Sequence, residues 1–397
     1  MNVNFKVLVF PLILVMVLLL STCKAESRGT VSKPLIWNIS NIDIVKCDTT
    51  YKTLYEHIIT KSDAFCAQGP IAVTDKKRTY APDNHYYCSI GTYWWPDPSN
   101  PGGKYIHKDG LSNPEKNEFD RTRLSALCRR CKYLSSAFYL TGDIKYYNAY
   151  LRQIRVWFID EETFMYPNLE YGQVIPGHNN NKGRTTGTID AYSFNDVIES
   201  FRLVNNTKNI DKETIIALQD WFASLVSWLE DASFGKKLAK ADNNVGLAYD
   251  MTLCNMLLFI EDDKEAKDIV DGFIEKRIFR QIEDNGMQPS ELKRTKAFTY
   301  SIFNLKHIMD FCFLARHWYD NFYEENCSRV DKAFEYLLTY VDDSDKFPFK
   351  EISNWDVCRR DLKIELKRRN LLMGNALPTD TLSRKSIKWE SIDELLK

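Results

Sequence analysis

The sequence lacks any marked excess of charge of one sign. Its 397 residues include 53 lysines and arginines and 54 aspartates and glutamates, so the formal net charge is -1. Proteins that hold nucleic acid or an anionic membrane surface by global electrostatics carry a clear basic excess. We therefore expect no nucleic-acid partner, and any site for an anion must be built locally.

Long apolar runs are also missing beyond the start of the chain. Residues 1–25 combine Lys6, the stretch VLVFPLILVMVLLL and the sequence CKA before Glu26, which is typical of a cleaved signal peptide. A membrane anchor is the competing interpretation, and Pro11 disfavours it; LSTC ending at Cys23 loosely resembles a lipoprotein box. No later stretch is long and apolar enough to span a bilayer, so we expect no membrane span after signal cleavage.

Familiar catalytic and metal-binding motifs are absent too. The sequence contains no H-E-x-x-H, no G-x-S-x-G and no Walker loop. The CRRC stretch from Cys128 to Cys131 has zinc or redox spacing, but it lies in a strong helical pattern without a second pair. That context favours helix packing or one disulfide partner, and we expect neither a metal nor a cofactor.

Cysteine is not scarce, and its number bears on the compartment. Nine cysteines follow residue 25, so an exported chain would form some disulfides and keep at least one thiol unpaired. Cys47, Cys66 and Cys88 lie in the irregular N-terminal part, where a disulfide would help most. Three N-x-S/T sequons begin at Asn38, Asn205 and Asn326. These features predict a secreted, extracellular protein, or a periplasmic one if the source is a Gram-negative bacterium.

Convincing strand alternation is missing, whereas helical periodicity dominates residues 120–373. One apolar stripe runs through Leu124, Leu127, Cys131, Leu134 and Phe138, and similar stripes recur within 147–158, 215–229, 269–278 and 302–313. Many antiparallel helices in one chain indicate a bundle, a solenoid or an α/α toroid. No composition break indicates a second domain. We expect a single domain over 26–375 and a polar tail, or a loosely packed last helix, over 376–397.

Aromatic residues are abundant, with 9 Trp, 21 Tyr and 22 Phe. Two of the tryptophans stand in an aperiodic stretch, GTYWWPDPSNPGGKYIHKDG, at residues 91–110. Its prolines and glycines predict a loop that forms neither helix nor strand. Because an aromatic side chain on a loop can stack on a ring-shaped ligand, Trp94 and Trp95 are candidate ligand contacts.

Four polar segments between the expected helices hold most of the candidate chemistry. They are residues 84–110, 166–190, 242–250 and 288–304, and they contain the sequences NHYYCSIGTYWWPDPSNPGGKYIHKDG, YPNLEYGQVIPGHNNNKGRTTGTID, NNVGLAYD and QPSELKRTKAFTYSIFNL. In this order the sequences resemble the four motifs of the alginate lyase family of secreted polysaccharide lyases, over about residues 80–320. The resemblance implies an all-α fold, an incomplete (α/α) toroid of antiparallel helical hairpins.

The resemblance also implies an activity and a partner. Family members cleave uronic-acid polymers by β-elimination, so the expected substrate is an anionic polysaccharide, mannuronate-rich alginate by default, and we expect a monomer. By motif, Asn244 and Arg294 match family residues around the substrate carboxylate, and Tyr300 matches the tyrosine at the scissile bond. The 91–110 loop would form a lid over a sugar-binding cleft, with one tryptophan anchoring it against the helices. The expected substrate-binding residues are Tyr93, Trp94, Trp95, His85, His178, Arg184 and Asn243.

Two positions depart from the family pattern. Val245 stands where the third motif normally has histidine, and Thr299 stands where the fourth usually has histidine before the tyrosine. Tyr300 must then act as base as well as acid. Forming its phenolate at pH 7 costs roughly 4 kcal/mol from a free pKa of about 10, and Arg294 nearby would reduce that cost. Neutralisation of the substrate carboxylate would rest on Asn244 and Arg294.

Two other functions remain open at this level. Loss of both histidines also fits a catalytically inactive carbohydrate-binding protein on the same scaffold. Toroids of this kind also host glycoside hydrolases, which need two opposed carboxylates. Asp190, Asp250 and Glu291 lie in or beside the motif loops, although capping a helix or holding an arginine would explain the two aspartates. Lyase products carry a C4–C5 double bond that absorbs in the near ultraviolet, whereas hydrolase products are saturated.

Overall fold

Helices form most of the computed structural model, which describes residues 29–374 and 389–397. The expected signal peptide, residues 1–25, lies outside the described residues. None of the described helices has the length and apolar character needed to cross a membrane. The α-helices are α2 (Ile39–Cys47), α3 (Lys52–Gln68), α4 (Asp120–Thr141), α5 (Ile144–Phe158), α6 (Phe194–Thr207), α7 (Lys212–Asp231), α8 (Ser233–Leu238), α9 (Asn244–Phe259), α10 (Asp263–Phe273), α11 (Phe279–Gln281), α12 (Pro289–Leu292), α13 (Ala297–Ala315), α14 (Phe322–Asn326), α15 (Ser328–Leu338), α16 (Trp355–Met373) and α17 (Ile392–Leu395).

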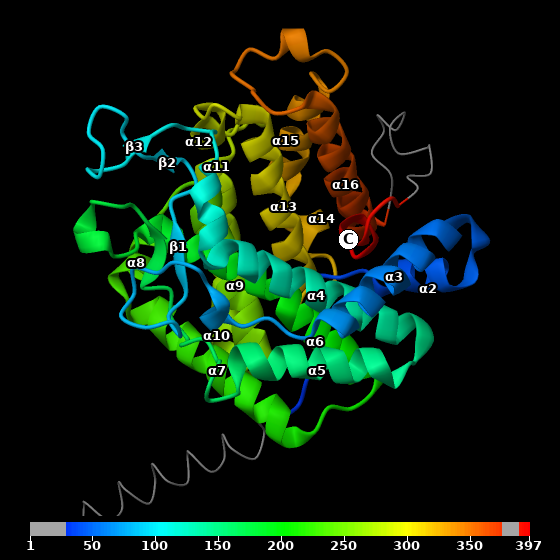
Figure 1. The fold of residues 1–397 in the computed structure, drawn as a ribbon. Coiled ribbons are helices and arrows are strands. Elements are labelled where there is room, and N and C mark those ends of the chain that lie inside the picture. The colour runs from blue at the N-terminus through cyan, green and yellow to red at the C-terminus, as the bar shows by residue number, and fades with distance from the viewer. Residues whose placement is uncertain (1–28, 375–388) are drawn as a thin grey trace, which may run out of the picture.

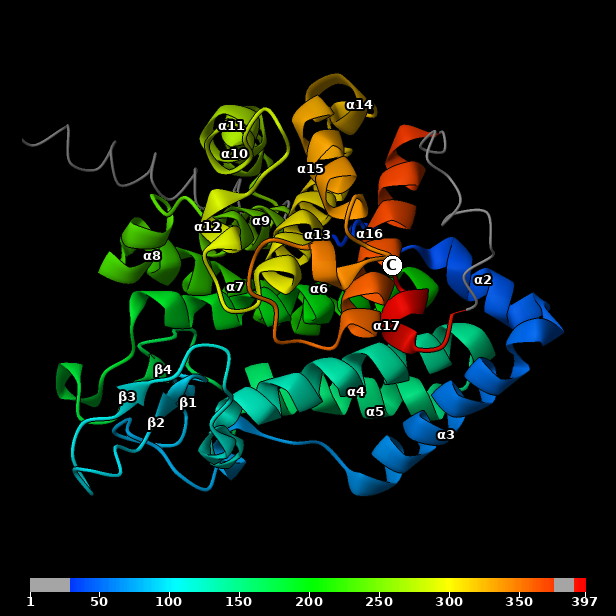
Figure 2. The same cartoon turned by 90° about the horizontal axis from the view of Figure 1, so that it is seen from above.

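The long helices follow one another around an arc (Figures 1 and 2). Helices α4, α6, α9, α13 and α16 form the inner row, in which each packs against the next. Helices α5, α7 and α10 run beside this row and pack against α4, α9 and their own neighbours. The arrangement is the expected incomplete α/α toroid, and the predicted fold class is confirmed.

Local sequence explains where these helices begin and end. Gly142 ends α4 with a left-handed φ of 70°, a conformation that only glycine adopts without strain. Asp143 then caps α5 by accepting a hydrogen bond from the Lys145 backbone N–H. The predicted stripe from Leu124 to Phe138 is buried along α4, so the periodicity identified the core-facing side correctly.

Four short strands lie at one end of the arc: β1 (Cys88–Ile90), β2 (Trp94–Trp95), β3 (Ile106–His107) and β4 (Tyr171–Val174). β1 pairs with β4 in parallel, and β2 pairs with β3 antiparallel, with Trp94 opposite His107. The prediction that residues 91–110 contain no strand is therefore wrong at β2 and β3. All three prolines of this stretch, together with Gly102 and Gly103, lie in the turn between the two strands, where they leave the ladder intact.

Of the expected polar tail, or loosely packed last helix, over 376–397, the structure describes residues 389–397, which include α17. Residues 389–397 pack into the core, with Trp389, Ile392, Leu395 and Leu396 all buried. The Asn38 backbone N–H donates to the Leu396 carbonyl at 2.9 Å. The apolar residues of this short segment cover the inner row of helices, which otherwise would expose apolar surface to water.

The cysteines also differ from expectation. All nine cysteines of the described residues are free thiols, and most are buried. Cys128 and Cys131 belong to the packed side of α4, and the Cys128 thiol donates to the Ser193 carbonyl at 3.1 Å. The N-terminal cysteines Cys47, Cys66 and Cys88 are not bonded to one another. Packing, rather than cross-linking, explains where these side chains lie.

Candidate functional site

Tyr300, in the first turn of α13, is the centre of a polar cluster at the strand-rich end of the arc. Its hydroxyl lies 3.0 Å from the Tyr93 hydroxyl and accepts a hydrogen bond of 3.1 Å from the Arg294 guanidinium. The Arg294 guanidinium also lies 4.0 Å from the centre of the Tyr300 ring. Tyr93 precedes β2, so this contact joins the lid loop to the inner helix across 207 positions of sequence.

Asp109 fixes the position of Arg294. Its carboxylate accepts a 2.9 Å hydrogen bond from the Arg294 guanidinium, and it accepts two more from the backbone N–H and hydroxyl of Thr295. Burial tends to raise the pKa of Asp109, but these hydrogen bonds outweigh that effect and lower the pKa to about 2. The carboxylate is therefore charged throughout the neutral range, and it holds the guanidinium beside Tyr300.

The surroundings of Tyr300 favour the neutral phenol. Burial raises the pKa of Tyr300 well above its ordinary value near 10, and the hydrogen bond with Tyr93 raises it further. Arg294 acts in the opposite direction and offsets only part of the increase. Arg294 thus reduces the cost of the phenolate, as the sequence suggested, but the free protein still keeps the tyrosine protonated at pH 7.

Asn244 begins α9 and is buried. Its side-chain amide donates to the Glu291 carboxylate at 2.6 Å, and its backbone N–H donates to the other oxygen of that carboxylate at 2.8 Å. Glu291 lies in α12, three residues before Arg294, and burial raises its pKa. This carboxylate therefore links Asn244 to the segment that carries Arg294 and Tyr300.

A buried ion pair positions the N-terminus of α9. Arg277, in the π-helical turn Ile274–Ile278, donates to the Asp250 carboxylate at 2.7 Å and to the backbone carbonyls of Ala239 and Ala241. Asn243 caps the helix by accepting hydrogen bonds from the backbone N–H groups of the next turn. The structure thus gives Asn243 a role as helix cap through its side-chain oxygen, and its expected role in substrate binding stays a prediction.

Arg184 belongs to a second cluster that reaches the same end of the arc. Its guanidinium donates at 2.7 Å to the side chain of Gln173, whose amide in turn donates to Asp190 at 3.3 Å. Arg121, at the start of α4, pairs with the same aspartate and lies close enough to Tyr93 to interact with it electrostatically. The two clusters therefore meet between Arg121 and Tyr93.

The backbone around Gln173 is unusually tight. Gln173 has a left-handed φ of 52°, which is uncommon for a residue other than glycine and costs of order 1–3 kcal/mol. Gly187 lies against it: a Cβ atom there would stand 1.9 Å from the Gly172 carbonyl oxygen. The glycines of the second motif allow β4 and the following 3-10 helix, Thr185–Ser193, to touch.

The two tryptophans are both held within the lid region. The Trp94 ring packs 5.2 Å from His107 and 5.3 Å from His178, and the His178 ring bonds to the Tyr105 carbonyl at 3.0 Å. The Trp95 ring N–H donates to the Leu111 carbonyl. Loop partners therefore hold the two tryptophan rings, whereas Tyr93 and Asp109 join the same loop to α13 and to the segment before it.

Three further positions have their recorded contacts outside the Tyr300 cluster: the predicted site residue His85 and the two departures from the family pattern, Thr299 and Val245. The His85 ring bonds to the Phe164 carbonyl at 2.7 Å and stacks on Tyr166, so no contact of His85 joins it to the cluster. The Thr299 hydroxyl donates to Ser353 at 3.0 Å. Val245 packs against the hydrophobic core.

Four residues complete the two clusters, and the sequence did not predict these contacts for them. They are Asp109, Arg121, Gln173 and Glu291. Asp109, Gln173 and Glu291 lie inside the four family-like motifs, and this position in the sequence could have indicated that they belong to the site. Arg121 lies outside all four motifs and follows Asp120 in an ordinary helix start, so nothing in its local sequence marks it.

The acidic residues do not form the pair that a glycoside hydrolase needs. Asp190, Asp250 and Glu291 are all buried and are bonded to Arg121, Arg277 and Asn244, respectively. Among the residues that the structure describes, no group of three or more His, Cys, Asp or Glu side chains could hold a metal ion. The arrangement instead offers phenol hydroxyls and guanidinium groups, which suit proton transfer beside an anion.

Comparison with known proteins agrees with this geometry. The family model for alginate lyase matches residues 72–347. A crystal structure of an alginate lyase from Bacteroides ovatus is 32% identical, covers 92% of this chain and 99% of its own, and superposes with a TM-score of 0.86.

Alginate lyase A1-III from Sphingomonas species A1, also solved as a variant with a bound tetrasaccharide, is 14% identical over 82% of this chain and 88% of its own. Its TM-score of 0.50 reports likeness of fold alone. No curated protein sequence matches the chain.

Proposed function

The chain belongs to the alginate lyase family, and from that premise we propose that it is a polysaccharide lyase that cleaves a uronic-acid polymer by β-elimination. The observation that carries the proposal is the Tyr300 hydroxyl, held between the Tyr93 hydroxyl at 3.0 Å and the Arg294 guanidinium at 3.1 Å. A proton carrier beside a fixed cation is the combination that β-elimination next to a carboxylate requires.

In the proposed reaction Tyr300 carries one proton. As a phenolate it removes the C5 proton of a uronosyl unit, the C4–O bond breaks, and a C4–C5 double bond forms. The phenol then returns the proton to the leaving glycosidic oxygen, so no net proton is consumed. General acid–base catalysis of this kind typically contributes about 10²- to 10⁴-fold in rate.

Arg294 has two tasks in this scheme. It stabilises the Tyr300 phenolate, and its guanidinium can bind the substrate carboxylate on which negative charge grows. Preorganised donors at such a position contribute on the order of 3 kcal/mol each. Because Asp109 holds the guanidinium in place, little reorganisation is needed when the charge develops.

Asn244 can donate fewer hydrogen bonds to the substrate carboxylate than the family pattern implies. One N–H of its amide is already donated to Glu291. Arg121 is the additional cation near Tyr93, and we propose that it takes over part of the carboxylate binding. Mannuronate-rich alginate is the first substrate to test, because the relatives are named for alginate.

A carbohydrate-binding protein without turnover is the second candidate. It is favoured by one observation, namely that Val245 and Thr299 stand at both family histidine positions, so neither position supplies an imidazole to the site. The two candidates differ in product, because only a lyase forms the C4–C5 double bond.

The deciding experiment follows near-ultraviolet absorbance while the purified protein acts on alginate, polymannuronate, polyguluronate and polyglucuronate. We expect absorbance to rise with at least one polymer. Tyr300→Phe keeps the ring and removes only the hydroxyl, so its turnover should fall a hundredfold or more while its circular dichroism stays unchanged.

A matched control is Tyr319→Phe, because Tyr319 is an exposed tyrosine whose hydroxyl bonds to Lys267 and Asp271 on the surface. Its turnover should equal that of the wild type. Equal turnover in the wild type and Tyr300→Phe would remove the proposed role of the tyrosine. Binding of oligosaccharide with no turnover on any polymer would instead support the second candidate.

Export is a separate part of the proposal. Residues 1–25 have the composition of a cleaved signal peptide, and we propose that the mature protein acts outside the cytoplasm. Mass spectrometry of protein from a secreting host should give a chain that begins at Glu26. A full-length chain retained inside the cell would contradict this part without affecting the activity.

A further inference from the structure

A cavity of about 310 Å³ lies between α4, α6 and α13, and Tyr300 is not part of its wall. Its wall includes Lys132 of α4, Tyr192, Lys306 of α13, and Leu396 and Lys397 at the C-terminal end. The volume is at the lower limit of the range of roughly 300–1,000 Å³ that is usual for small-ligand sites. No step of the proposed reaction uses this cavity.

Almost every charged group in the wall has a partner of opposite charge. Lys132 pairs with Asp196 at 2.9 Å and with Asp393 at 2.5 Å, and Asp310 pairs with Arg368 at 2.6 Å. The other two pairs join Glu199 to Arg202 and Lys397 to Glu365.

Lys306 is the exception. Among the described residues it makes no hydrogen bond and no ion pair, and its ammonium lies 5.0 Å from the centre of the Tyr192 ring. Burial, and then the nearby charge of Lys397, lower the pKa of Lys306 to about 8, against the effect of Asp310. Lys306 is therefore the lysine of the cavity wall that has carboxylates nearby but no direct ionic partner among the described residues, which is the feature expected of a site for one anionic group.

The accessible face of α13 connects this lysine to Tyr300. Between Tyr300 and Asp310 only Phe303 and Lys306 are not buried. At 100° per residue, Phe303 lies about 60° from each of its two partners around the helix, and Lys306 is about 9 Å along the axis from Tyr300. The three side chains therefore form a slanted strip that turns about 120° around the helix from Tyr300 to Lys306, with an aromatic ring midway.

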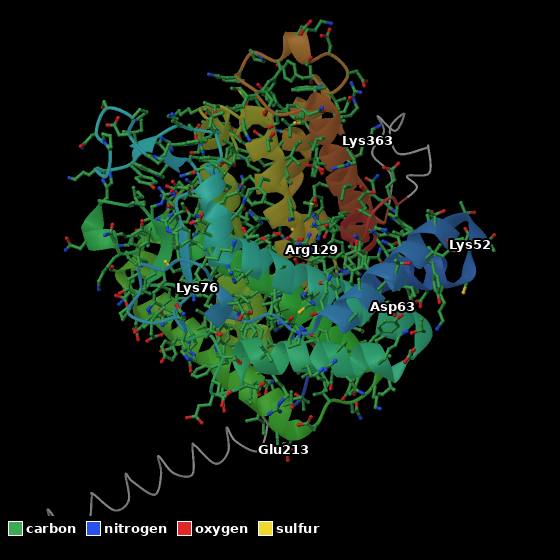
Figure 3. All side chains as sticks on the ribbon, viewed as in Figure 1. Lys52, Asp63, Lys76, Arg129, Glu213 and Lys363 are labelled. Carbon is green, nitrogen blue, oxygen red and sulfur yellow. The ribbon has the colours of Figure 1, made fainter. Side chains whose placement is uncertain are left out.

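A matching strip runs along α4. Arg121, Ser125, Arg129 and Lys132 are not buried, and Figure 3 shows Arg129 near the middle of the molecule on this helix. Arg121 reaches the Tyr93 and Tyr300 cluster, and Lys132 lines the cavity about 16 Å further along the axis. Both helices thus carry accessible polar residues from the reacting tyrosine to the cavity.

The C-terminal segment occupies the far side of the cavity. Asp393 is held by Lys132, the Leu395 carbonyl accepts from the Asn41 side chain at 2.9 Å, and Lys397 is held by Glu365. In Figure 2 α17 lies between α4 and α16, at the end away from β2 and β3. A polymer that followed the two strips would meet this segment and could not continue.

We propose that the cavity binds the terminal uronosyl unit of the polymer, with the carboxylate of that unit at Lys306, so that cleavage is exolytic. The inference rests on the proposed lyase function, and it adds a subsite and a mode of action. The ring of Phe303 would pack against the intervening sugar, and α17 would set how many units lie beyond Tyr300.

The first test compares double bonds formed with loss of viscosity on the best polymer substrate. An exolytic enzyme releases short oligosaccharides from the start, so absorbance should rise while viscosity falls slowly and size-exclusion chromatography shows no products of intermediate length. A rapid fall in viscosity with long intermediates would overturn the exolytic mode and leave the lyase function intact.

The second test measures binding and does not depend on turnover. Isothermal titration calorimetry with a saturated mannuronate trisaccharide should give equal affinity for the wild type and Tyr300→Phe, and at least tenfold weaker affinity for Lys306→Gln. Lys52→Gln is the matched control, because Lys52 is an exposed lysine on α3 (Figure 3), away from β2 and β3. Lys306→Arg should retain most of the binding.

These measurements separate the two proposals. A wild type without turnover on any polymer, but with trisaccharide binding that depends on Lys306, would refute the lyase function and support the subsite. Equal affinity in the wild type and Lys306→Gln, with circular dichroism showing both folded, would overturn the subsite whatever the turnover.

Discussion

Tyr300 has two polar neighbours that act on its acidity in opposite directions. Burial and the Tyr93 hydroxyl raise its pKa above 10, and the Arg294 guanidinium lowers it. The balance favours the protonated phenol, which suits the acid step and makes the base step depend on a small phenolate fraction. Among the described residues no histidine bonds to this hydroxyl, so the tyrosine must supply both steps.

This balance predicts a pH dependence. The phenolate fraction increases tenfold for each pH unit below the pKa of Tyr300, so kcat/KM should rise with pH through neutrality with a slope near one. The measurement is kcat/KM for the best polymer between pH 6 and 9. A profile with a plateau beginning near pH 6.5, the ordinary pKa of histidine, would contradict tyrosine as the base.

Val245 offers a test of the missing donor. It follows Asn244 in the first turn of α9, and the Asn244 amide is already committed to Glu291. Val245→His should add a donor near the substrate carboxylate and raise kcat/KM on polymannuronate. Val245→Leu serves as an apolar control and should not raise it. In a site built for another ligand the imidazole would be left unpaired, at a cost of about 1–3 kcal/mol in the free energy of unfolding.

At the scale of elements, the start of α9 matters most for the site. The helix begins with Asn243 as its cap, and the Arg277 guanidinium holds the preceding loop through two backbone carbonyls. Since Asn244 and Val245 belong to the first turn, their positions depend on this local structure. Asn243 contributes to the site by fixing the helix start.

We therefore predict that Asn243→Ala lowers the free energy of unfolding by about 1 kcal/mol, the usual loss on removing such a cap. Asn243→Asp keeps an oxygen acceptor and should restore most of that stability. Urea unfolding followed by circular dichroism measures both. If Asn243 instead binds substrate, the alanine variant would keep its stability and raise KM.

At the scale of the whole molecule, the two ends of the chain segment described here help to complete the toroid. The residues near Asn38 and those of α17 bond to each other and to α4 and α16. Residues 389–397 thus cover the inner row. This closure gives the molecule one accessible end, where the strands and Tyr300 lie, and one covered end at α17.

Export would change one pair of thiols. The sulfur atoms of Cys312 and Cys327 lie 3.9 Å apart in the core, whereas Cys47 is exposed and isolated from other thiols. In an oxidising compartment we predict a Cys312–Cys327 disulfide, which closes a loop of about 15 residues and adds about 3 kcal/mol to the free energy of unfolding. Non-reducing peptide mapping of secreted protein should find this linkage.

Two variants make the disulfide prediction specific. Cys312→Ser should abolish the linked peptide and lower the thermal unfolding temperature of secreted protein, and Cys47→Ser should do neither. A linkage among Cys47, Cys66 and Cys88 in its place would show that the N-terminal part is cross-linked and would contradict the packing described above.

The sequence by itself determined the fold and the position of most site residues along the chain. Apolar spacing of 3.6 residues decides which face of a helix is buried, and that spacing is local, so the stripe on α4 was readable without tertiary information. The four motifs likewise located Asn244, Arg294 and Tyr300. The polar turn residues correctly predicted a loop at 91–110, but they did not predict the two short strands within it.

Only the tertiary structure decided which of these residues act together. Tyr93 and Tyr300 are 207 positions apart, Asn244 and Glu291 are 47 apart, and α17 reaches α4 from the far end of the chain. Such contacts form only when whole helices pack together, and that packing depends on many other contacts at the same time. No local sequence pattern therefore encodes them. The same packing made Asn243 the cap of α9, left Lys306 without an ionic partner among the described residues, and formed a cavity between α4, α6 and α13.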